Sequence, residues 1–278
     1  MLDFFSYQFI QNAFWASLLI SVIAGFIGTY IVARRLVFLS GGITHASFGG
    51  IGIAWYFGIN PILGASIFSI LTAIGLESLT KGKVLREDSA IGMLWSIGMA
   101  IGIFFVFLTP GYAPNLMSYL FGNILTISMV DIQLLLALSV VVTLFFSVFY
   151  SPILFISFDQ DYAQTQHVPA KFISYMLKIL VAMAIVFSIR AIGIILLISL
   201  LTIPANIANL FTKRFNRIIT LSGIISFLSI TFGIILSYRL NVPSGATIII
   251  ALMFFYLFAK LVAWARLTIF MESLKVNG

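Results

Sequence analysis

The sequence contains no cysteine and very little charge. None of its 278 residues is a cysteine, and only 8% are Asp, Glu, Lys or Arg. The absence of thiols excludes disulfides, thiolate metal sites and thiol nucleophiles, so any metal ligand must be an imidazole, carboxylate, hydroxyl, amide or carbonyl. Soluble globular domains carry roughly a quarter charged residues. The composition therefore argues against a soluble domain.

Sequence motifs for enzymatic chemistry are also missing. No GxxxxGK[ST] sequence occurs, so the chain has no P-loop for ATP, and any ATP hydrolysis must come from another subunit. Neither HExxH nor GxSxG is present, and no combination of Ser, His and Asp suggests a catalytic triad. We therefore expect a protein that is not an enzyme.

Apolar sequence dominates the chain. Hydrophobic residues make up 62% of it, and the mean hydropathy is +1.16. A helix needs roughly 20 apolar residues to cross the hydrocarbon core of a bilayer. We expect an all-α, polytopic integral membrane protein in which residues 1–278 form a single transmembrane domain of about nine spans, with eight as the alternative. The nine predicted spans are 12–33, 44–59, 62–80, 89–108, 132–150, 172–189, 191–211, 218–237 and 244–264.

The basic residues predict the orientation of these spans. Of the fifteen Lys and Arg, all but Arg190 and Arg239 fall on one side of nine alternating spans, and basic residues concentrate in cytoplasmic loops. This places the N-terminus outside and the C-terminus in the cytoplasm. The net charge of +7 is spread in twos and threes, without the exposed patch that nucleic acid needs, so we expect no nucleic-acid partner. Asp3 and the absence of a basic N-terminal region argue against a cleaved signal peptide.

The acidic residues avoid the middle of the predicted spans. Asp131 lies at the edge of a span, Glu77 lies within a turn of a span's cytoplasmic end, and the other six lie outside the spans. Proton-coupled transporters and selective cation channels usually place carboxylates at membrane depth. A self-sufficient secondary transporter or channel for a small cation is therefore the alternative function, and the distribution of carboxylates disfavours it.

The stretch from Arg34 to Gly52, RRLVFLSGGITHASFGGIG, is the most informative part of the chain. Its five glycines allow backbones to approach closely on either side of His45, the one histidine at membrane depth. His45 is either a packed, hydrogen-bonded residue or a ligand that offers a neutral imidazole nitrogen to a passing cation. In the second case Thr44 and Ser47 would contribute hydroxyl oxygens to a weak site.

This stretch resembles a motif in the integral-membrane permeases of zinc- and manganese-type ABC importers. Members of that family have one or two arginines, an apolar run, and then Ser/Gly-Asp-x-x-Ser/Thr-His-Ala followed by glycines. The matching residues are Arg34, Arg35, Phe38, Leu39, Ser40, Thr44, His45, Ala46, Gly49, Gly50 and Gly52. Gly41 stands where the family has the aspartate. In the family, the aspartate and the histidine lie four residues apart on one helix face and would hold a divalent cation together.

The longest predicted cytoplasmic connection spans residues 151–171. Its composition alone fits a solvated connector as well as a short helix on the membrane face. It resembles the family's Phe-Asp-x-x-x-Ala pattern at Phe158, Asp159 and Ala163. The resemblance implies that 157–168 is the coupling segment that docks into a groove of the ATPase subunit, with His167 standing in place of a family glycine.

A third block, from Arg190 to Leu210, resembles the family's Gly-x-Leu-Leu, Leu and Pro-Ala-x-x-Ala pattern. The matches are Gly193, Leu196, Leu197, Leu201, Pro204, Ala205 and Ala208. Pro204 inside a span bends the helix and frees a backbone carbonyl. Freed carbonyls and Asn206 would serve a passing cation, or Asn206 forms only an interhelical hydrogen bond.

The resemblance covers most of the chain and implies a function. It implies the permease subunit of an ABC importer that moves zinc, manganese or iron across the cytoplasmic (inner) membrane of a prokaryote. The implied partners are a cytoplasmic ATP-binding subunit, an extracellular metal-binding protein and a second copy of the chain, with the path between the two copies. We expect no cofactor on this chain, because the metal is cargo and ATP binds the partner. The available ligand types do not separate the three metals.

Overall fold

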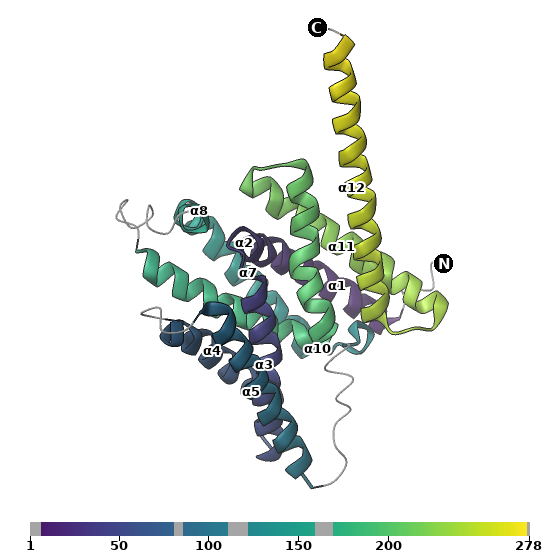
Figure 1. Ribbon diagram of the computed structural model, residues 1–278. Coiled ribbons are helices and arrows are strands. Elements are labelled where there is room, and N and C mark those ends of the chain that lie inside the picture. Colours follow the sequence, from purple (N-terminus) through teal and green to yellow (C-terminus); the bar gives the residue numbers. More distant parts are fainter. Residues whose placement is uncertain (1–6, 81–85, 111–121, 159–168, 277–278) are drawn as a thin grey trace.

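A computed structural model describes residues 7–80, 86–110, 122–158 and 169–276, and all regular structure within these ranges is helical (Figure 1). The predicted all-α fold is confirmed. In chain order the helices are α1 (Gln8–Ile23), the π-helix η2 (Ala24–Gly28), α2 (Thr29–Ala33), α3 (Val37–Tyr56), α4 (Pro61–Thr80), α5 (Glu87–Leu108), the 3-10 helix η3 (Ile124–Thr126), α7 (Met129–Val148), α8 (Tyr150–Phe158), α10 (Ala170–Phe211), α11 (Phe215–Leu240) and α12 (Ser244–Val276).

Seven helical stretches in the described part of the chain are long and apolar enough to cross a membrane. They are Gln8–Ala33, Val37–Tyr56, Asp88–Leu108, Met129–Val148, Ala170–Phe211, Phe215–Leu240 and Ser244–Arg266. Pro61–Leu76 of α4 is apolar but shorter. Helix length alone therefore does not confirm the predicted nine spans. The difference lies in α4 and in α10, which joins the predicted spans 172–189 and 191–211 into one helix.

The 42 residues of α10 do not form one straight helix. Gly193 has φ 75° and ψ 165°, a conformation available almost only to glycine, and the two halves of α10 run in different directions (Figure 1). The loop before η3 passes against this break at Gly122, where an added Cβ would collide with the Gly193 amide nitrogen. Two glycines in left-handed conformations therefore meet where α10 changes direction.

Glycines pack α3 tightly against α4 and α5. A Cβ at Gly50 would overlap the Gly64 carbonyl of α4, and a Cβ at Gly52 would overlap the Gly102 carbonyl of α5. Gly98, four residues before Gly102, lies against the Ala46 backbone. Lipid gives no hydrophobic driving force between helices, so close van der Waals packing of this kind is a main source of their association. Helices α3 and α5 make the most extensive contact between any two elements described.

The start of the second predicted span is wrong. Helix α3 begins at Val37 and ends at Tyr56, whereas the sequence predicted 44–59. Each glycine costs a helix about 1 kcal/mol relative to alanine, but here the close packing that the glycines allow outweighs that cost. His45 therefore lies eight residues into the helix, about 12 Å from its first residue.

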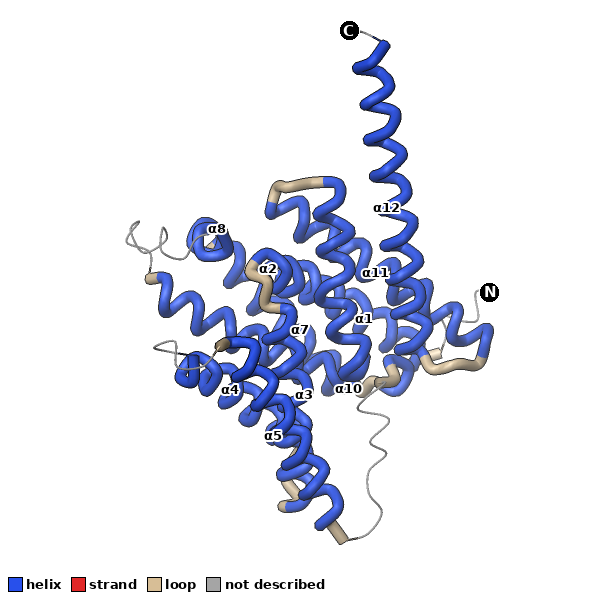
Figure 2. Tube along the Cα trace, in the orientation of Figure 1, coloured by secondary structure: helices blue, strands red, loops and turns tan. Residues whose placement is uncertain are grey.

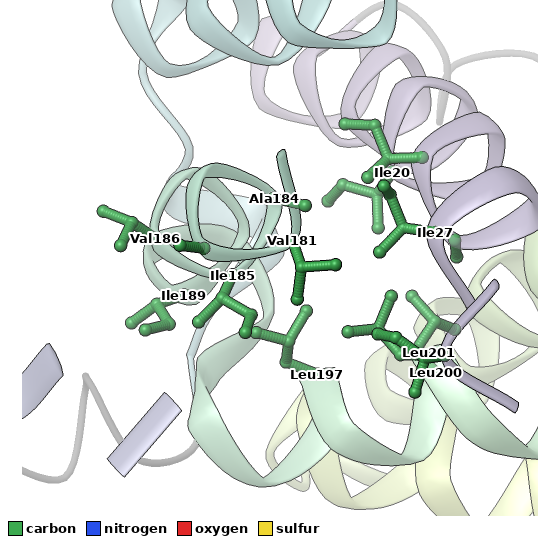
Figure 3. Close-up of a cluster of buried hydrophobic side chains, with 14 of the residues drawn as sticks. Ile20, Ile27, Val181, Ala184, Ile185, Val186, Ile189, Leu197, Leu200 and Leu201 are labelled. Carbon is green, nitrogen blue, oxygen red and sulfur yellow. The ribbon is translucent and has the colours of Figure 1, made fainter. Parts of the chain in front are cut away.

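The main apolar core lies between the first span and α10. In Figure 3, Ile20 and Ile27 of the first span face Val181 from the first half of α10 and Leu200 and Leu201 from the second half. All five are 2% exposed or less. The π-helix η2 forms part of this contact, where Gly28 packs against the Leu201 carbonyl. Figure 2 shows α12 extending past the other helices toward the C-terminus.

Candidate metal path and ATPase contact

His45 of α3 stacks on Trp95 of α5. The ring centroids are 4.1 Å apart and the ring planes differ by 9°. The imidazole is half-buried, and its Nδ1 is buried without a hydrogen-bond partner. Stacking fixes the plane of the imidazole, and the buried Nδ1 is a polar atom whose hydrogen-bonding capacity is unused.

Sequence reasoning missed Trp95. The signal that could have found it is the register of the glycine contacts, because Gly98 packs against Ala46 and Trp95 lies one turn before Gly98. In this parallel helix pair, that turn is level with His45. The register of α3 against α5, however, is a property of the fold.

Gly41 lies one turn before His45 on the same helix face. A Cβ there would make ordinary contacts, 3.7 Å from the Trp95 ring and 3.8 Å from the Cδ1 of Ile198 in α10. At the neighbouring Gly42, by contrast, a Cβ would lie 2.6 Å from the Cγ2 of Ile91. Packing therefore disfavours any Cβ at Gly42, whereas a Cβ at Gly41 would cause no steric clash. Helices α3, α5 and α10 meet here, and their packing leaves room for a Cβ at Gly41.

Thr44 and Ser47 are not brought to the imidazole. Both are fully buried, and their hydroxyls donate to carbonyls of α3 itself, Thr44 to Ser40 and Ser47 to Thr44, each at 2.6 Å. Residues one or two positions apart point to different sides of a helix. The structure therefore places both hydroxyls away from the face that carries His45.

Asn206 lies on α10, and its exposed side chain donates from Nδ2 to the Thr202 carbonyl at 2.9 Å. It is eight residues beyond Ile198, about 12 Å further along the helix, so it does not join His45 at one point. Pro204 leaves the Leu200 carbonyl without its usual helical donor, but Leu200 is fully buried. Asn206 and Thr202 continue the face of α10 that starts beside Gly41.

Among the residues assigned to ATPase coupling, Phe158 alone falls within the described ranges. Asp159, Ala163 and His167 lie outside them. Phe158 ends α8 and its side chain is 72% exposed, whereas Ile153 and Ile156 of the same helix are fully buried. Helix α8 therefore docks on the bundle through one face and presents an exposed phenylalanine at its end.

An ion pair joins α7 to α10 close to the break at Gly193. The buried Asp131 carboxylate accepts from Arg190 Nη1 at 3.1 Å and from the backbone N–H of Ser128, also at 3.1 Å. Arg190 is about half exposed. In the described ranges, no group of three or more His, Asp or Glu gathers that could hold a metal ion, so the candidate ligand site is the lone imidazole of His45.

Apolar helices long enough to span a membrane, packed closely through glycines, are the architecture of a polytopic membrane protein. Residues 6–263 match the ABC 3 transport family, and the chain belongs to that family. The resemblance drawn from the sequence is confirmed. The chain is the membrane permease component of an ABC transporter.

Individual relatives match over almost the whole chain. An uncharacterised membrane protein of Synechocystis sp. is 38% identical over 257 residues, covering 92% of both chains. The manganese transport system membrane protein MntC of Halalkalibacterium halodurans is 32% identical over 257 residues, covering 90% of this chain and 88% of the relative. The solved structure of PsaBC from Streptococcus pneumoniae in complex with Fab has a TM-score of 0.82 at 27% identity, covering 91% of each chain.

Proposed function

We propose that this chain is the permease subunit of an importer that moves a divalent transition metal, manganese ahead of zinc or iron, across the cytoplasmic membrane of a prokaryote. The observation that carries the proposal is the near full-length similarity to a manganese transport system membrane protein. Two copies of the chain form the path between them. A cytoplasmic ATP-binding subunit supplies the energy, because this sequence has no P-loop, and an extracellular metal-binding protein delivers the ion.

The whole chain acts as one transmembrane domain with nine crossings. Counting α4 as a crossing, and the two halves of α10 as one crossing each, gives the number that the sequence predicted. With an external N-terminus and a cytoplasmic C-terminus, Arg190 and Arg239 are the two basic residues left outside.

In this proposal His45 is the first protein ligand that the ion meets within the path. Trp95 holds the imidazole plane, and a nitrogen lone pair replaces one water of the hydrated ion. Without a carboxylate at Gly41 the site is weak, which suits an ion that must leave again. The exposed face of α10 with Thr202 and Asn206 continues the path toward the cytoplasm. His45 and Asn206 are thus successive positions rather than ligands of one site.

The segment 157–168 docks into the ATP-binding subunit. The exposure of Phe158 at the end of α8 supports this role, because a large apolar side chain outside the bundle is a typical anchor for a partner protein.

Vesicles containing the chain and its ATP-binding subunit test the proposal. Uptake of radioactive manganese and zinc should require ATP, and His45→Ala should lower it at least about ten-fold at unchanged protein level, since losing a ligand-shell residue typically costs that much. Met93→Ala, an exposed change on the helix that carries Trp95, is the control and should transport normally.

Two results would contradict different parts of this proposal. Normal uptake by His45→Ala would remove the ligand role and leave His45 as a packing residue. Uptake that needs no partner subunit and follows an ion gradient instead of ATP would favour the secondary transporter or channel.

A further inference from the structure

Arg34 joins two parts of the chain that are far apart in sequence. Its side chain, half-buried at the end of the first span, donates from Nη1 to the Ile156 carbonyl of α8 at 2.7 Å. Ile156 lies in the last turn of α8, where carbonyls have no donor within the helix. A guanidinium at this position satisfies one of these carbonyls and is favoured by the negative end of the helix dipole. Arg34 therefore caps the C-terminus of α8.

The turn after Arg34 is short and tightly bonded. The Leu36 N–H donates to the Ile31 carbonyl at 2.8 Å, and Arg35 takes the left-handed conformation, with φ 58°, that this type of helix end requires. Helix α3 begins directly afterwards, at Val37. Since a hydrogen-bonded turn links Arg34 to α3, a displacement of Arg34 also displaces the start of that helix.

Helix α3 would have to move together with α4 and α5, because its backbone lies directly against theirs at Gly50 and Gly52. His45 lies on this helix, eight residues from its start. Helix α8, which accepts the hydrogen bond from Arg34, has only nine residues and ends with the exposed Phe158. The capped carbonyl of Ile156 is two residues before Phe158.

We propose that Arg34 is a positioning residue, one that transmits movement of the end of α8 to α3 and thereby to His45. This inference rests on the proposed function of 157–168 as the ATPase contact. Arg34 touches no cargo in this proposal and acts through the Ile156 carbonyl. Arg35 has the same charge and is its sequence neighbour, but its side chain is exposed. It is therefore the matched control for charge near this helix end.

The test uses the full complex in vesicles and measures manganese transported per ATP hydrolysed. Arg34→Gln should keep the protein level, the bound ATP-binding subunit and the basal ATP hydrolysis, while manganese transported per ATP falls about ten-fold, as expected from losing a charge-assisted hydrogen bond. Arg35→Gln should keep the wild-type ratio. Arg34→Lys keeps a cationic donor and should recover part of the loss.

A normal ratio in Arg34→Gln, or equal losses in the two glutamine variants, would overturn the inference. So would a proportional fall of transport and hydrolysis, because that is the result expected of a merely structural residue. If Arg34→Gln fails to accumulate, Arg34→Lys decides the question. A ratio between the wild-type value and about one tenth of it, at normal basal ATP hydrolysis, supports the cap, whereas the full wild-type ratio or a fall of about ten-fold or more overturns the inference. If the wild-type complex takes up no manganese with ATP, the proposed function is overturned as well. If the wild-type complex transports manganese and Arg34→Gln has the same ratio of manganese transported to ATP hydrolysed, only this inference is overturned.

Discussion

The contact between α3 and α5 and the contact between α7 and α10 hold their helices by opposite means. Glycines bring α3 and α5 together backbone against backbone, with Gly52 on Gly102 and Ala46 on Gly98. At the α7–α10 contact, the buried Asp131 pairs with Arg190 next to the break in α10. The first contact has no room for a Cβ at Gly52, Gly98 or Gly102 and uses no charge. The second depends on charge and on one unusual backbone conformation.

The two helix contacts lie beside different features of the molecule. The α3–α5 contact holds His45 against Trp95, and a contact made by backbone atoms fixes that geometry with little freedom. The α7–α10 contact lies where a helix changes direction. Its ion pair holds α7 beside that change of direction, and breaking the pair would leave the buried Asp131 carboxylate without its cation.

The largest effect should come from adding one carbon to the glycine contact. In Gly102→Ala the new Cβ would lie 2.5 Å from Phe48 Cδ1 and 2.6 Å from the Phe48 carbonyl oxygen, which should destabilise the protein by about 3 kcal/mol. Gly92→Ala changes the same helix in the same way where no atom lies within 4 Å, and should stabilise by up to about 1 kcal/mol. Thermal unfolding of the purified variants measures both. Equal midpoints would show that close packing is not what holds α5 on α3.

A smaller loss is expected at the break in α10. Gly193→Ala places a Cβ on a residue with φ 75° and ψ 165°, which costs about 2 kcal/mol of backbone strain. Gly75→Ala, in open space on α4, is the control and should not lower the unfolding temperature. If Gly193→Ala unfolded at the wild-type temperature, the conformation at the break would not be a requirement of the fold.

The ion pair should respond asymmetrically. Arg190→Gln leaves the buried Asp131 carboxylate without its cation and should cost about 2 kcal/mol. Asp131→Asn should cost about 1 kcal/mol, because the half-exposed Arg190 can turn to water. Chemical denaturation at matched salt compares the two variants. A larger loss in Asp131→Asn would mean that the hydrogen bond from the Ser128 N–H to Asp131 at the start of α7, and not the charge pair, dominates this contact.

The smallest effect on stability is expected beside His45. In Gly41→Asp the new Cβ meets no atom closer than 3.7 Å, so we expect this variant to unfold within about 1 kcal/mol of wild type. Its carboxylate should strengthen manganese retention and slow turnover, as measured by metal content after washing and by uptake rate. Gly42→Asp, where Ile91 blocks the Cβ, should fail to accumulate. Unchanged retention in a folded Gly41→Asp would argue against a cation at this position.

The sequence predicted the helical fold, the importance of the glycine stretch and a boundary close to Gly193, because these depend on local composition and on single special residues. It missed Trp95, whose role depends on the register of α3 against α5. Thr44 and Ser47 were grouped with His45 by closeness in sequence, whereas a helix turns them to other sides. The sequence did not predict that α3 starts at Val37, because the low helix propensity of its glycines is visible in the local sequence, whereas the close packing against α4 and α5 that they allow is a property of the tertiary structure.

In the proposed nine-span topology, one residue decides on which side of the membrane the chain after α10 continues. An unbroken helix of 42 residues would be about 63 Å long, roughly twice the thickness of a bilayer's hydrocarbon core. At Gly193 the two halves of α10 instead take different directions, and the nine-span topology proposed above counts this long apolar segment as two crossings. In that topology, the side of the membrane on which each end of α11 and α12 lies depends on a residue that has no side chain.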